Sequence, residues 1–166
     1  MTDRSPIPDG RTNLTRVGAV SLDATRRQAP PALSIDEIQL VVFIIRCARV
    51  ITFLQRIVPG RYLPSKEDTV PRSLLKRLIR ELKKLIPKWK WTSSARKLPR
   101  SPAKLGDELF YAITTIRMRR DEIWRAGYKD CVTVLDEVYA LLYSIGIRMR
   151  ERKHRSEGQQ VDANSP

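Results

Sequence analysis

Apolar residues at helical spacing constrain the fold of this chain more than any other feature. In the stretch SLLKRLIRELKKLIPKWKW, residues 73–91, leucine and isoleucine recur every three or four positions, and most of the residues between them are lysine or arginine. Three further segments show the same spacing, whereas no useful length of the chain alternates between apolar and polar residues. Because a period of about 3.6 residues belongs to amphipathic helices and a period of two to strands, the sequence predicts helices only.

Proline, glycine and capping residues divide the four periodic segments from one another. Ser34 can cap the first helix, and Pro59-Gly60 would terminate it. The predicted helices cover about 34–58, 71–87, 101–127 and 129–152. Four amphipathic helices with short connections are what a four-helix bundle requires. We therefore predict an all-α fold, an up-down four-helix bundle over residues 34–155, between a disordered N-terminal extension, 1–33, and a disordered tail, 156–166.

The chain is strongly basic, with 32 Lys and Arg against 18 Asp and Glu and a net charge of +14. An excess of this size favours a polyanionic partner, either nucleic acid or an anionic membrane surface. The most apolar stretch, residues 38–54, is interrupted by Arg46 and Arg49, so we expect a buried helix there and not a membrane span. The N-terminus has no secretory signal pattern. We expect a cytoplasmic protein without a membrane partner.

Cysteine and histidine are too few and too scattered for an ordinary metal site. Cys47 and Cys131 lie within apolar helical patterns, so we expect both to be reduced and buried. His154 is the only histidine, and no glycine-rich phosphate loop is present. The sequence predicts neither a metal nor a cofactor.

The basic residues are concentrated in residues 72–100, where eleven lysines and arginines accompany a single acid, Glu81. Like charges one helical turn apart repel each other. A row of basic residues with almost no acidic neighbours therefore suggests that a ligand supplies the negative charge, and a nucleic-acid phosphate backbone is such a ligand. Trp91 could stack on unpaired bases. The predicted nucleic-acid contacts are Arg72, Lys76, Arg77, Arg80, Lys83, Lys84, Lys88, Lys90, Arg96, Lys97 and Arg100, extended by Arg148, Arg150, Arg152 and Lys153.

Other interpretations of the basic residues stay open. A basic helix can be solvated without a partner, or it can lie on a membrane surface, although the other helices need its apolar face. The chain can also be a protein–protein interaction module, such as a viral or phage accessory factor. Arg148 and His154 have the spacing found in HEPN-type ribonucleases, in which Arg would hold a phosphate and His would move a proton. Because the surrounding residues are mostly basic, this spacing arises readily by chance, and we predict that the protein is not an enzyme.

The segment GYKDCVTVLDEVYALLYSIGIRM, residues 127–149, resembles the last helix of a known four-helix-bundle family. This family includes the accessory variability determinant of diversity-generating retroelements and proteins encoded in intervening sequences of bacterial rRNA genes. The similarity rests on Leu135, Asp136, Glu137 and Val138, followed by Leu141 and Leu142, and on Val58, Pro59 and Arg61 at the end of the first helix.

The resemblance implies a ring-forming homo-oligomer, which is a pentamer in the retroelement protein. It further implies that basic surfaces bind a reverse transcriptase and its template RNA without the protein being the enzyme itself. Together with the charge argument, this predicts a non-enzymatic accessory protein that binds nucleic acid, with RNA favoured, and assists a reverse transcriptase or a similar enzyme.

Overall fold

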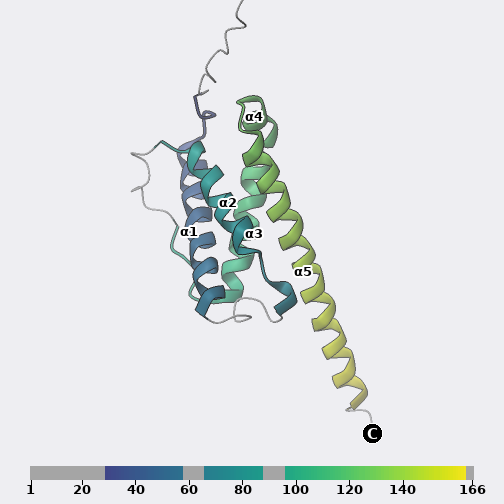
Figure 1. Cartoon of the computed structure of the whole chain (residues 1–166). Helices are drawn as coiled ribbons and strands as arrows, with labels where there is room; N and C mark the ends of the chain where they lie inside the picture. The colour runs from purple at the N-terminus through teal and green to yellow at the C-terminus, as the bar shows by residue number, and fades with distance from the viewer. Residues whose placement is uncertain (1–28, 58–65, 88–95, 164–166) are drawn as a thin grey trace, which may run out of the picture.

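A computed structural model describes residues 29–57, 66–87 and 96–163 of the chain (Figure 1). These ranges contain helices and no strand, so the prediction of an all-α fold is confirmed. Two short 3-10 helices, η1 at Lys66–Asp68 and η2 at Lys83–Leu85, accompany the α-helices. The α-helices are α1 at Ile35–Ile57, α2 at Arg72–Leu82, α3 at Pro102–Arg117, α4 at Arg120–Arg125 and α5 at Lys129–Ala163.

The four longer helices surround one core. Helices α2 and α3 both begin at the end where α1 finishes, so they run parallel and the predicted up-down order is wrong. The connection between them, residues 83–101, is long enough to return to that end. Helix α1 packs against α2 and α3, and α5 packs against the same two helices from the other side (Figure 1). The short helix α4 lies on α5. Within the described ranges, no helix is long and apolar enough to cross a membrane.

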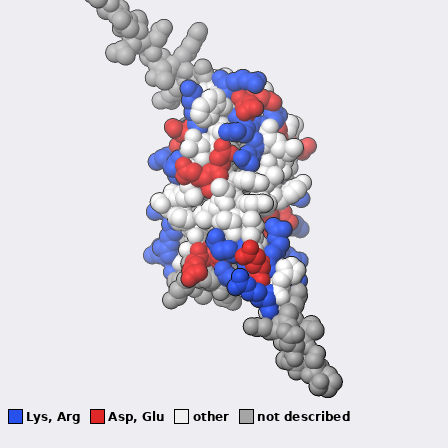
Figure 2. All heavy atoms as spheres, turned by 90° about the vertical axis from the view of Figure 1, so that its right-hand side faces the viewer, with Lys and Arg blue, Asp and Glu red and all other residues white. Residues whose placement is uncertain are grey.

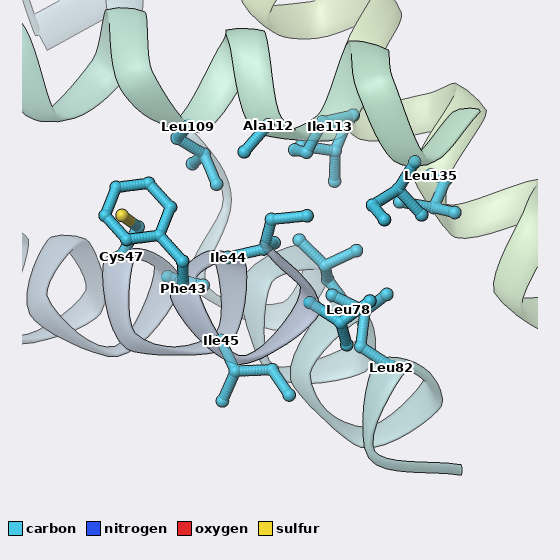
Figure 3. Close-up of a cluster of buried hydrophobic side chains, with 14 of the residues drawn as sticks. Phe43, Ile44, Ile45, Cys47, Leu78, Leu82, Leu109, Ala112, Ile113 and Leu135 are labelled. Atoms are coloured by element: carbon cyan, nitrogen blue, oxygen red, sulfur yellow. The ribbon is translucent and has the colours of Figure 1, made fainter. Parts of the chain in front are cut away.

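The core is built from the apolar stripes that the helical periodicity predicted. Figure 3 shows side chains of all four longer helices meeting in one cluster, among them Ile44 of α1, Leu78 of α2, Ile113 of α3 and Leu135 of α5. Each large aliphatic side chain that is buried in this way contributes about 1.5–3 kcal/mol. Cys47 and Cys131 are free thiols inside this core, as the sequence predicted.

Helix α1 begins at the capping box that its first residues encode. The Ser34 hydroxyl accepts a hydrogen bond from the Glu37 amide at 3.2 Å, and the Glu37 carboxylate accepts one from the Ser34 amide at 2.8 Å. Both bonds satisfy donors that a helix start leaves unpaired. Arg119 Nη1 lies 2.7 Å from the same carboxylate and ties the end of α3 to the start of α1.

The third predicted helix, 101–127, is not continuous, and in this respect the prediction is wrong. Helix α3 ends at Arg117, the chain turns through Met118 and Arg119, and α4 then runs to Arg125. The turn lets Ile123 enter the core, while the polar residues around it stay at the surface. Gly127 follows with a φ of 90°, a left-handed conformation that favours glycine and ends the segment as predicted.

The second and last helices differ in length from their predictions. Helix α2 ends at Leu82 and tightens into η2 before Pro87, so its α-helical part is shorter than 71–87. Helix α5 continues to Ala163 instead of ending near 152, and its C-terminal part extends past the other helices (Figure 1). The predicted disordered segments lie partly outside the described residues, and 156–163 belongs to α5.

Candidate nucleic-acid interface

Helix α2 separates its apolar and basic residues onto two sides. Leu75, Leu78 and Leu82 have no exposed surface. The basic residues occupy the opposite side, where Lys76 and Arg80 of α2 and Lys83 and Lys84 of η2 are all exposed. The solvent-facing basic row on this helix therefore has the placement that its sequence predicts.

The sequence argument assumed that no acidic side chain neutralises the basic row, and this is wrong. Glu81 is buried, and its two carboxylate oxygens accept hydrogen bonds from Arg80 and Lys84. Burial alone would raise the pKa of Glu81, but the hydrogen bonds from Lys84 and Arg80 outweigh it and hold the pKa below its ordinary value. The single acid of this segment thus neutralises part of the charge of two neighbours.

A second acid reaches the row from α5. The Arg77 guanidinium donates two hydrogen bonds to Glu137, at 3.0 and 2.8 Å. Arg72 donates to the backbone carbonyl of Gln55 at 2.7 Å and fastens the start of α2 to the end of α1. Within the described part of the chain, Lys76 has no ion-pair partner. The row is therefore less repulsive than its sequence suggests.

The residues that follow α2 are only partly described. Lys88, Lys90 and Trp91 lie outside the described residues. Arg96 Nη1 lies 4.0 Å from Glu108 of α3. Lys97 and Arg100 are exposed in the extended segment that leads into α3.

The buried carboxylate of Asp68 joins η1 to α5. Arg148 Nε lies 3.1 Å from its Oδ1, and Arg152 Nη2 lies 2.7 Å from its Oδ2. Asp68 has no exposed surface, whereas the side chains of Arg148 and Arg152 keep 39% and 41% of theirs. The two arginines therefore carry a structural role in addition to any contact with a ligand. No local pattern predicts this link, because Asp68 and Arg148 are 80 residues apart.

The contacts of Asp68 and of Arg72 bring basic residues from four helices to one end of the molecule. At this end α1 finishes, α2 and α3 begin, and α5 runs out past them (Figure 1). We call this set the basic end: Arg56, Arg72, Lys104, Arg148, Arg150, Arg152, Lys153 and Arg155.

Three members of the basic end, Arg56, Lys104 and Arg155, were missed by the sequence argument. The signal that could have found Arg56 is topological, since the antiparallel helices α1 and α2 bring the last turn of one beside the first turn of the next. Lys104 reaches this end because α3 runs parallel to α2, which no local pattern indicates. The exposed acids at this end are Glu67, Asp107 and Glu151. Figure 2 shows Lys and Arg atoms around the acidic atoms at the lower end of the described surface.

Arg148 and His154 do not form a shared site within one chain. Both lie on the continuous helix α5, where a separation of six residues places two side chains about 120° apart around the axis. Arg148 is also engaged with Asp68 and with the hydroxyl of Ser144. Among the described residues, no group of three or more His, Cys, Asp or Glu could hold a metal ion.

Comparison of the chain with protein-family models, curated proteins and solved structures finds no match. The resemblance of the last helix to the retroelement accessory family therefore stays a prediction.

Proposed function

We propose that this protein is a non-enzymatic accessory factor that binds nucleic acid, RNA in preference, through phosphate contacts from the basic end and the outer side of α2. In this proposal the four longer helices are a four-helix bundle that serves as a rigid support. The contacts do not depend on base sequence, since lysine and arginine on a helical surface neutralise phosphates of any sequence.

The observation that carries the proposal is the convergence of eight basic side chains at the basic end. Seven of them are classed as exposed, and Arg148 is half-buried. The one fully buried acid there, Asp68, lies beneath Arg148 and Arg152 and orients their guanidinium groups. Arginine predominates in this set, and its planar group can bind phosphate oxygens through two hydrogen bonds at once.

A reverse transcriptase or a similar enzyme as partner, a homo-oligomer, which is a pentamer only if the family resemblance holds, and a cytoplasmic location stay predictions. They follow from the family resemblance and the composition, and the basic end supplies only the RNA contact that such a factor would need.

The test is the fluorescence anisotropy of a labelled, structured RNA titrated with the protein over a salt series. One variant replaces Arg56, Lys104, Arg150 and Arg155 with alanine and leaves the arginines that hold Asp68 in place. Each lost phosphate contact reduces the slope of log K against log salt by about 0.7–0.9, so the expected reduction is about 3 for four contacts.

A matched control loses the same charge elsewhere. It replaces Arg46, Arg49, Arg125 and Lys129, which are exposed at other places on the surface, with alanine. The control should keep most of the parent slope. Equal loss in both variants would mean that net charge alone drives binding, and no binding at about 150 mM salt, near physiological ionic strength, would refute the proposal.

The same titration separates the two alternatives. A protein–protein interaction module should have no affinity for RNA at physiological salt. A ribonuclease should cleave the RNA and lose that activity in His154→Ala, whereas an accessory protein should bind equally well with and without His154.

A further inference from the structure

The middle of α5 is uncharged around its whole circumference. Residues 138–147, VYALLYSIGI, contain no Asp, Glu, Lys or Arg in a chain of which 30% is charged. Val138, Leu142 and Ile145 enter the core, but Ala140, Tyr143 and Ile147 are on the outer side, and Tyr143 and Ile147 are 48% and 37% exposed. Their spacing of three and four residues places them on one stripe of the helix.

Figure 2 views the molecule from the side that lies to the right in Figure 1, where α5 runs. An uncharged band crosses the middle of this face, with charged side chains above and below it. Contiguous apolar surface with a charged border is typical of a protein interaction site.

A groove of about 580 Å³ lies beside the stripe, between α3 and α5. Its walls include Phe110 of α3 and Tyr143 and Met149 of α5, and the two glycines Gly106 and Gly146 leave it hollow. Phe110 and Tyr143 stack with their ring centroids 6.5 Å apart. The stripe and the groove therefore form one apolar surface of the size that a helix can fill.

Gly146 is not required by packing within the chain. A glycine inside a helix costs about 0.5–1 kcal/mol relative to alanine. A Cβ atom built on Gly146 would meet nothing within 4 Å. Close approach of another backbone is a physical reason for glycine at such a position.

We propose that a second copy of this chain covers this face, with its α5 antiparallel to the first α5, in a dimer of two-fold symmetry. In such a dimer the stripe of each copy lies against the stripe of the other, because a two-fold axis perpendicular to α5 pairs the patch with itself. The groove borders the stripe, so pairing the stripes also brings the two grooves face to face and covers their apolar walls.

The charge along α5 selects the antiparallel direction. From Lys129 to Ile147 the helix has three acidic residues and one basic residue, whereas from Arg148 to Ser156 it has five basic residues and one acidic residue. A parallel pair would place the two basic segments side by side, and like charges at an interface are strongly unfavourable. The antiparallel pair instead keeps the two basic segments apart. It places each of them beside the half that holds Asp130, Asp136 and Glu137, of which Asp136 and Glu137 already pair with arginines of their own copy.

The first experiment measures the mass of the full chain by sedimentation and light scattering over a concentration series. We expect twice the monomer mass of 19.2 kDa. Tyr143→Arg introduces a charge at the centre of the interface and should raise the dissociation constant by at least about thirty-fold, as for a hot-spot residue.

The control is Phe53→Arg, which makes the same kind of change at a 59% exposed aromatic residue of α1. It should leave the mass unchanged, and circular dichroism should show that both variants are folded. A monomer at all concentrations, a pentamer or an equal effect of Phe53→Arg would refute the proposal.

The second experiment tests the direction of α5 with two single-cysteine variants, Ala140→Cys and Ile147→Cys, that are mixed and oxidised. Positions 140 and 147 oppose each other in the antiparallel pair, whereas two copies of position 140 are about 10 Å apart along the axis, beyond the reach of a disulfide. We expect a disulfide between the two different variants only. Disulfides within each variant alone would show a parallel pair and refute the arrangement. Cys47 and Cys131 do not interfere, because both are fully buried.

Discussion

At the scale of single residues, Cys47 and Cys131 give the protein a defined response to alkaline pH. Burial, together with the nearby carboxylate of Glu108 for Cys47 and of Glu81 for Cys131, raises the pKa of both thiols to about 12. Below pH 9 the thiols are protonated in the folded and unfolded states alike. Above pH 9 the unfolded thiols lose a proton that the folded thiols keep until about pH 12, so the free energy of unfolding falls.

The expected fall is about 1.4 kcal/mol per pH unit for each thiol between pH 9 and pH 12. Urea denaturation at several pH values in this range would measure it. The control, with Cys47→Ala and Cys131→Ala, should lose stability less steeply as the pH rises. Parallel slopes for the two proteins would show that other groups control the alkaline transition.

Gly146→Ala provides a second prediction at this scale, because it should stabilise the monomer but weaken the proposed dimer. With open space at its Cβ position, Gly146→Ala should raise the free energy of unfolding of a monomer by about 0.5–1 kcal/mol. The measurement is urea denaturation in the Tyr143→Arg background, in which association does not contribute. In the parent background the same change should weaken the dimer. A loss of stability in the monomer would mean that the site is more crowded than its surroundings indicate.

At the scale of helices and their connections, the contact between η1 and α5 determines how firmly the end of the bundle is held. Asp68→Asn keeps the shape of the side chain but removes the anion that Arg148 and Arg152 share. The buried side chain at position 68 then no longer attracts the two arginines electrostatically, although Arg148 and Arg152 stay partly solvated. We expect the free energy of unfolding to fall by about 1–3 kcal/mol.

Asp130→Asn is the matched control for this change, since Asp130 is an exposed acid near the start of the same helix. Surface substitutions of this kind are usually within about 0.5 kcal/mol of the parent. Denaturation of both variants under the same conditions would settle the difference. A cost for Asp68→Asn no larger than that of the control would show that the contact adds no stability.

The helices also show which parts of the fold are local enough to be predicted from sequence. The start of α1 was predictable, because Ser34 and Glu37 are three residues apart and form their capping box without help from the rest of the chain. The break after α3 was not, because Ile116 and Ile123 are seven residues apart, a spacing that an uninterrupted helix would also give. Periodicity cannot detect a turn that preserves it.

The candidate interface likewise has features that the sequence predicts and features that depend on the placement of the helices in space. That Lys76 and Arg80 face away from the core follows from their positions between the leucines of α2, and the structure places them there. The pairing of Arg77 with Glu137 joins residues 60 apart, so it depends on how α2 and α5 are placed in space. Charge counts along a segment therefore overstate the field of its surface wherever another helix supplies the counter-ion.

At the scale of the whole molecule, the basic end adjoins the uncharged face of α5, since Arg150 and Lys153 of the basic end also line the groove. In the proposed antiparallel dimer the two basic ends lie at opposite ends of the paired helices. Because positions 140 and 147 oppose each other, residue 152 lies opposite residue 135 of the other copy, so the two basic segments are centred about 25 Å apart along the helix axis. Two RNA-binding surfaces at a fixed separation should give a dependence of affinity on RNA length.

An A-form RNA duplex of about 8 base pairs is shorter than this separation, whereas one of about 30 base pairs spans it. Simultaneous engagement of both ends raises the local concentration for the second contact, so the longer duplex should bind at least tenfold more tightly. Tyr143→Arg should remove this advantage and leave the affinity for the short duplex unchanged, as measured by anisotropy at constant salt and equal concentration of binding sites. If the advantage persists in the monomeric variant, it arises from sliding or from several proteins on one RNA, and the two basic ends do not act together. If neither duplex binds, the RNA proposal fails while the dimer stands on its mass alone.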